Sequence, residues 1–271
     1  MPAMRGAMAL LHGVASNHTR WSEFIRDSAL RESWQLLAPD LRGHGAKAFR
    51  GRIGIDEWCD DLVALLDRER LPRAVVAGHC LGANLALHFA ARHPDRTAGL
   101  VLIEPMPPEA LAGTMRRVSR LRPLLSAILG VVRFFNAIGL RRRNLQPLDL
   151  EKLDKETRAA LARGPQGEAQ LARYASPFFD LRTTATAAYL QDLLAVTEAL
   201  PPAEAIPVPV LALLAAQSNF TDVEQVTTYL ARIASCEILT LPAKHWIPTE
   251  QPDAMRAAIE AWIAKRFPEG I

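Results

Sequence analysis

The stretch VAGHCLGA, residues 76–83, places Cys80 between Gly78 and Gly82 at the end of an apolar run. The run at 73–78 predicts a buried strand, and the apolar residues of the segment that follows Cys80 have helical spacing. A G-x-C-x-G pattern between a strand and a helix is typical of a nucleophile on a tight turn, where glycine leaves room for the backbone. The alternative is a structural thiol, because cysteine is among the residue types most often buried.

The predicted turn would place the Cys80 thiol at the N-terminus of a helix. The unpaired amides there favour a thiolate and donate to a developing oxyanion. His12-Gly13 directly follows the first apolar run and introduces a second loop. We therefore expect the amides of Val14 and Leu81 to form an oxyanion hole.

Short apolar runs alternate with helical patterns along most of the chain, which predicts an α/β protein with a mainly parallel sheet covered on both faces. The predicted strands are 7–13, 35–40, 73–78, 99–104, 208–215 and 236–242. The alternation stops after Glu104, where about a hundred residues show helical periodicity only. We expect a core formed by residues 1–105 and 205–271, with a helical cap at 106–204.

The composition of the 271-residue chain excludes several classes of protein. Its 32 basic and 29 acidic residues give a net charge of +3, so no global field favours nucleic acid as a partner. The three cysteines form neither a zinc-ligand spacing nor an even disulfide framework. Without a signal peptide, a spanning apolar run or a phosphate-cradling glycine loop, we expect a cytoplasmic protein with no metal or organic cofactor and no stable membrane insertion.

Five segments together resemble the α/β-hydrolase superfamily, and in the family's order: LLHGVASNHTRW, APDLRGHG, AGHCLGA, LVLIEP and KHWIPTEQPD. The resemblance implies an enzyme with Cys80 as nucleophile and His245 as general base, and a helical cap after Glu104. It also implies that His44, in the DLRGHG loop, is structural. The expected activity is cleavage of an ester or thioester of a hydrophobic acyl substrate through a Cys80 thioester.

The chain departs from the family in three places. Most members have serine where this chain has Cys80, and only a short segment precedes His12, which implies missing or reduced N-terminal strands. The acid that orients the histidine is also displaced, because Asn219 occupies its usual position. The prediction is Glu104, at the end of an earlier strand, with Asp222 or an orienting Asn219 as alternatives.

The segment between Thr114 and Asn144 contains eight arginines and no acidic residue. We favour a cap whose apolar face covers the active site while its arginines face water. The alternatives are arginines that meet a phosphate-bearing carrier such as coenzyme A, or a basic helix that lies on a membrane surface. The expected partner is a small acyl substrate, and the oligomeric state is not predicted.

Two other functions remain open for the same site. An acyltransferase or cyclase would pass the acyl group from Cys80 to an alcohol or amine in place of water. A non-catalytic member of the superfamily would use the pocket only to bind a ligand.

Overall fold

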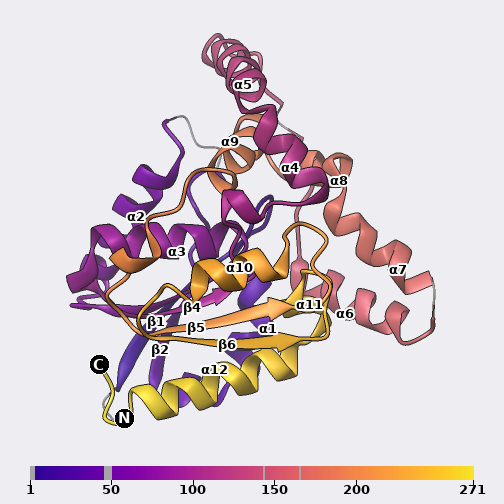
Figure 1. The fold of residues 1–271 in the computed structure, drawn as a ribbon. Coiled ribbons are helices and arrows are strands. Elements are labelled where there is room, and N and C mark those ends of the chain that lie inside the picture. Colours follow the sequence, from indigo (N-terminus) through magenta and orange to yellow (C-terminus); the bar gives the residue numbers. More distant parts are fainter. Residues whose placement is uncertain (1–3, 46–50, 143, 165) are drawn as a thin grey trace.

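A computed structural model describes residues 4–45, 51–142, 144–164 and 166–271. Its centre is a six-stranded sheet in the order β2-β1-β3-β4-β5-β6, with every neighbouring pair parallel (Figure 1). The strands are β1 (Gly6–Leu11), β2 (Trp34–Leu37), β3 (Ala74–His79), β4 (Thr97–Ile103), β5 (Val210–Ala215) and β6 (Cys236–Leu241). The α/β class and all six predicted strands are confirmed. In the described part of the chain, β1 is the first strand and no antiparallel strand precedes it.

Helices cover both faces of the sheet, as the apolar strands require. One face packs against α2 (Ile55–Arg68), α3 (Leu81–Arg92) and α10 (Val223–Leu230), and the other against α1 (Ser22–Asp27) and α12 (Pro252–Arg266). Successive side chains of β3 point to opposite faces of the sheet: Val76 packs in the hydrophobic core under α2, α3 and α10, whereas Val75 and Ala77 pack in the core under α1 and α12. The sheet is therefore a rigid base for the loops at the carboxyl ends of its strands.

The segment between β4 and β5 is helical, and no strand of the sheet comes from its described residues. It contains α4 (Gly113–Arg120), α5 (Arg122–Ala137), α6 (Leu150–Leu161), α7 (Gln166–Leu171), α8 (Pro177–Thr183) and α9 (Thr186–Val196). We call residues 106–204 the inserted helical segment. None of the helices described combines the length and the apolar character needed to cross a membrane.

A buried asparagine ties both ends of the inserted helical segment to α3. The Asn84 amide donates to the carbonyls of Met106 and Val196, at 3.2 and 3.1 Å, and its oxygen accepts from the Met106 amide at 2.9 Å. Asn84 is fully buried, so these bonds meet the hydrogen-bonding needs of an amide that cannot reach water. The helix that follows Cys80 therefore also anchors the segment.

Replacing Gly78 with alanine should destabilise the fold by about 3 kcal/mol or more. A Cβ at this position would lie 2.1 Å from the Gly82 carbonyl oxygen, a backbone atom that cannot rotate away. Urea denaturation of the purified variant measures the loss. Gly130→Ala is the matched control: nothing lies within 4 Å of its added Cβ. In the middle of a helix this change should raise stability by about 0.5–1 kcal/mol.

Candidate active site

Cys80 lies on the sharp turn between β3 and α3. Its backbone has φ 54° and ψ −113°, in a region that side-chain-bearing residues rarely adopt, and its amide donates to the Ile103 carbonyl at 2.9 Å. The thiol is buried, with Sγ 3.3 Å from the Met106 sulfur at the start of the inserted helical segment. A strained residue held between two elements in this way marks a candidate functional position.

The loop after β1 passes directly against this turn. A Cβ built on Gly13 would lie 3.3 Å from the His79 carbonyl oxygen and 3.4 Å from the Cys80 Cβ, so an added methyl group would be tightly packed against the turn. Val14 is the next residue, and Leu81 is the first residue of α3, whose first-turn amides have no acceptor within the helix. The two amides predicted to form an oxyanion hole thus belong to two segments that lie next to Cys80.

His245 meets Glu104 beneath the surface. Its Nδ1 lies 3.0 Å from Glu104 Oε2, and both side chains are at most 3% exposed. Glu104 directly follows β4, with φ 52°, and its two oxygens also accept from the Ala215 amide at 2.6 Å and the Ser218 hydroxyl at 2.8 Å. The carboxylate therefore has a fixed orientation toward the imidazole. Ser218 is a contributor that the sequence patterns did not indicate.

The environment of His245 favours the imidazolium. Burial acts to lower the pKa of His245, but hydrogen bonds with Cys80 and Glu104 and the negative charge of both partners outweigh burial and raise the pKa to about 10. Removal of Cys80 or Glu104 would therefore lower the pKa of His245. This arrangement can hold a proton next to Cys80 and release it to a leaving group.

The alternative acids occupy different places. The Asp222 carboxylate caps α10 by accepting from the amides of Glu224 and Gln225, at 3.0 and 3.2 Å. Asn219 is exposed, and its backbone N–H donates to the Lys244 carbonyl at 3.1 Å. Of the three candidates, Glu104 is the one whose side chain meets His245.

His79 supports the histidine loop from within the nucleophile turn. Its Nε2 lies 3.1 Å from the carbonyl oxygen of His245, and the two rings are 5.1 Å apart. Complete burial, together with the positive charges of His245 and Arg20, holds the pKa of His79 well below its usual value, so the ring stays neutral and donates to that carbonyl. Sequence patterns placed His79 beside the nucleophile without showing this contact.

A second buried pair joins α9 to the loops of the sheet. Asp192 Oδ2 accepts from the Ala15 amide at 3.0 Å and lies 2.8 Å from His44 Nε2. Burial acts to lower the pKa of His44, but the Asp192 carboxylate outweighs it and raises the pKa above the usual 6.5. His44 therefore has a structural contact, and Asp192 holds the residue next to Val14.

Asp192→Asn should destabilise the protein by about 3–5 kcal/mol at pH 6, because it removes one partner of a buried charged pair. The folded-state pKa of His44 is raised, so this stabilisation is fully present below pH 6.5 and is lost as the pH rises through that folded-state pKa. Urea denaturation at pH 6 and pH 9 should show the gap between wild type and variant narrowing at pH 9. Glu204→Gln, in an exposed pair with Arg232, should leave stability nearly unchanged, because water screens such a pair. An equal loss in both variants would contradict the role given to Asp192.

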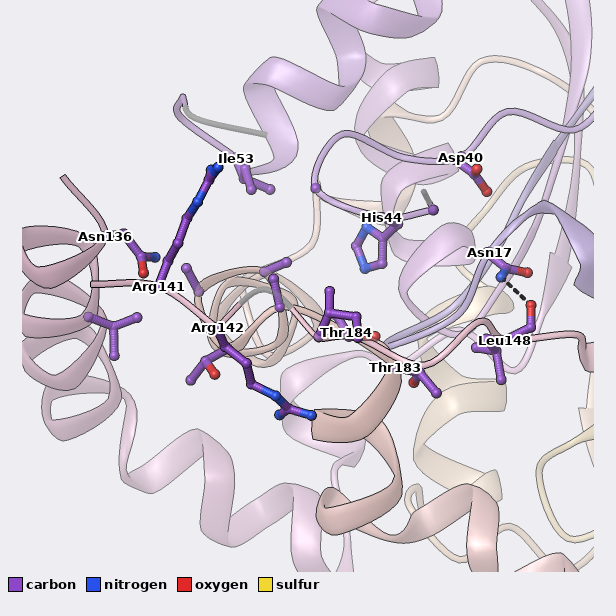
Figure 2. Close-up of a pocket in the computed structure, with 18 of the residues that line it drawn as sticks. Asn17, Asp40, His44, Ile53, Asn136, Arg141, Arg142, Leu148, Thr183 and Thr184 are labelled. Carbon is purple, nitrogen blue, oxygen red and sulfur yellow. Dashed lines mark hydrogen bonds between the residues drawn. The ribbon is translucent and has the colours of Figure 1, made fainter. Parts of the chain in front are cut away.

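A cavity of about 1160 Å³ lies between the loops of the sheet and the inserted helical segment (Figure 2). Asp40 and His44 line it from the loop after β2, whereas Arg141, Arg142 and Thr184 line it from the inserted segment. Cys80, His245 and Glu104 are not among the described residues that line it. The cavity described by these residues therefore does not contain the Cys80 turn.

The described residues include no group of three or more histidine, cysteine or acidic side chains placed to hold a metal ion. All three cysteines are free thiols.

Comparisons with known proteins agree with this architecture. The model of the "Alpha/beta hydrolase family" matches residues 8–258. Lipase LipV from Mycobacterium tuberculosis is 28% identical over 269 residues, covering 98% of this chain and 96% of the relative. The 3-oxoadipate enol-lactonase 2 from Acinetobacter baylyi is 26% identical over 272 residues, covering 98% and 91%. The crystal structure of the enol-lactonase from Burkholderia xenovorans superposes with a TM-score of 0.68 at 20% identity, covering 97% of this chain and 92% of that one. The family model spans nearly the whole chain, so this protein belongs to the alpha/beta hydrolase family.

Proposed function

We propose that this protein is a cysteine-dependent hydrolase that cleaves an ester or thioester of a hydrophobic acyl substrate. The observation that carries the proposal is the buried His245 imidazole, which lies 3.0 Å from the Glu104 carboxylate and whose pKa is raised by Cys80, a thiol on a strained turn at a helix N-terminus. Nucleophile, base and orienting acid that interact in this order are the arrangement that acyl transfer requires. The lipase and lactonase named above support an ester as substrate.

In the first half-reaction, the Cys80 sulfur attacks the acyl carbon and forms a C–S bond. His245 holds the thiol proton and delivers it to the leaving alcohol or thiol as the old bond breaks. The amides of Val14 and Leu81 would donate to the oxyanion that forms on the carbonyl oxygen. The product of this step is an acyl thioester on Cys80.

In the second half-reaction, water attacks the thioester carbon. His245 takes one proton from the water and returns it to the sulfur as the C–S bond breaks, which releases the free acid. Glu104 keeps Nδ1 bonded throughout, so Nε2 is the nitrogen that exchanges protons with Cys80 and the water. In this scheme residues 1–105 and 205–271 form the core and residues 106–204 act as the cap. The mechanism needs a reduced thiol, which fits the free state of all three cysteines and a cytoplasmic location.

Mass spectrometry of the intact protein tests the proposal directly. The protein is mixed with p-nitrophenyl esters of two to ten carbons, and separately with the matching acyl-coenzyme A thioesters. A single acyl adduct on Cys80 that decays in water is the expected result, with faster turnover for longer chains. No adduct and no release of acid with any ester or thioester would refute the enzymatic proposal and favour a ligand-binding member of the fold.

The fate of the adduct distinguishes hydrolysis from transfer. If added alcohols or amines accelerate its loss and appear as esters or amides, the enzyme is an acyltransferase. If only free acid forms, water is the acceptor. A preference for coenzyme A thioesters over simple esters would support a carrier-linked substrate.

A further inference from the structure

The helix α5 exposes an unpartnered apolar stripe. Leu121, immediately before it, begins a run of large apolar residues at intervals of three and four: Leu121, Leu124, Ile128, Val131, Phe135 and Ile138. Each of these is between 42% and 58% exposed, and the neighbouring Phe134 is 63% exposed. At 3.6 residues per turn this spacing keeps all of them on one side of the helix. A contiguous exposed apolar surface of this kind marks a site of interaction.

The stripe is not needed to attach α5 to the protein. The helix packs through Leu125, Leu129 and Val132 against Leu190 and Leu194 of α9. Figure 1 shows α5 projecting from the body of the molecule, beyond α4 and α9. Helix α5 is therefore apolar on two sides, and its second side faces outward.

The charge around the stripe has one sign. Residues 110–148 include eight arginines and no lysine or acidic residue. The described arginines that are exposed lie at both ends and along the helix: Arg116, Arg117, Arg120, Arg133 and Arg142. Arg143 lies outside the described residues. A partner of this surface must therefore be both apolar and anionic.

We propose that the stripe and its flanking arginines, which we call the α4–α5 surface, dock on an anionic lipid layer. The apolar side chains would enter the boundary between headgroups and acyl chains, while the guanidinium groups bind lipid phosphates. A second copy of this chain is disfavoured, because pairing two such surfaces would bring arginines against arginines without any acidic partner.

Docking would also orient the cavity. Phe135 and Leu140 belong to the exposed apolar residues and line the cavity as well, next to Arg141 and Arg142. The lipid layer would then lie at one wall of the cavity, and an apolar substrate could enter without crossing water. This inference goes beyond the proposed function and does not depend on the role of Cys80, since binding to lipid is measured without turnover.

Vesicle flotation tests the surface with the whole chain. The probes are vesicles of phosphatidylglycerol and phosphatidylcholine in equal parts, and vesicles of phosphatidylcholine alone. We expect at least tenfold tighter binding to the anionic vesicles at low salt, and a decrease as salt screens the arginines. Equal binding to both vesicles, or no binding to either, would overturn the proposal.

Two variants separate the apolar and the charged contributions. Leu124→Ser with Val131→Ser and Phe134→Ser removes apolar contacts, and Arg117→Glu with Arg120→Glu reverses charge. Each should weaken binding to anionic vesicles about tenfold or more. The matched controls are Phe178→Ser, at 81% exposure in α8, and Arg68→Glu at the end of α2. Both controls should bind as the wild type does.

Circular dichroism and sedimentation velocity complete the test. The variants should keep the helix content and thermal midpoint of the wild type, because the substituted side chains face outward. Wild type and variants should sediment alike in the absence of vesicles. A wild-type oligomer that the serine variant dissociates would overturn lipid docking and assign the surface to a second copy.

Discussion

Replacing Cys80 with alanine should abolish the acyl adduct and lower kcat by about a millionfold, the loss seen when a covalent nucleophile is removed. The fold should survive, because alanine fits wherever the larger thiol fits. The measurement is intact-protein mass spectrometry with the p-nitrophenyl esters, beside steady-state kinetics. Persistence of a stoichiometric adduct in the alanine variant would show that another residue is acylated.

Cys80→Ser is the matched control for the chemistry of the adduct. A serine on the same turn, beside the same base, should still be acylated, but as an oxygen ester. Neutral hydroxylamine should strip the acyl group from wild-type Cys80 and leave it on the serine variant. Acyl groups of equal lability on both proteins would contradict a thioester at position 80.

Glu104→Gln should lower kcat by about ten-thousand-fold, because the amide no longer stabilises the imidazolium or its tautomer. The same change should lower the pKa of His245, since the Glu104 carboxylate is one of the groups that raise it to about 10. In the wild type, the His245 imidazolium is lost only as the pH rises through its raised pKa of about 10. A plot of kcat/KM against pH should therefore fall near pH 10. The variant's alkaline limb should move to lower pH, a shift that a purely structural defect would not produce.

Asp222→Asn and Asn219→Ala are the matched controls for this assignment. Asparagine is as good a helix N-cap as aspartate, so the first should cost a few tenths of a kcal/mol at most, as a rough figure. Both variants should keep kcat within twofold of the wild type. A large loss of kcat in either variant, with Glu104→Gln still active, would move the orienting role away from Glu104.

Local patterns were sufficient to predict the sheet. The six strands appear as short apolar runs because both faces of a covered parallel sheet are buried, so each run could be located without knowing its neighbours. The nucleophile turn was also readable from its local G-x-C-x-G pattern, and the contact that requires Gly78 is local, with the Gly82 carbonyl oxygen. The contacts that require Gly82 come from the carbonyl oxygens of Leu11 and His12, in a distant segment. The helical segment between Glu104 and Val208 was visible because helical periodicity continues there without a further short apolar run.

Contacts between distant segments could not be read in this way. Asp192 and Ala15 are 177 residues apart, and nothing in either local sequence indicates that the carboxylate would hold the loop after β1. The exposed stripe of α5 has the same apolar spacing as a buried one. Only the packing of its other side on α9 shows which side faces outward.

The sequence by itself determined the class of fold, the strand-turn-helix around Cys80 and the set of three candidate acids for His245. Only the tertiary structure decided which of the three side chains contacts the histidine. Glu104 is 141 residues from His245 in the chain, and its Oε2 lies 3.0 Å from the Nδ1 of that ring. The physical reason is the strand order. β4 and β5 are neighbours and β6 follows β5, so the parallel sheet brings the residue after β4 and the loop after β6 to the same edge. Spacing along the chain records periodicity, whereas this proximity depends on which strands pair.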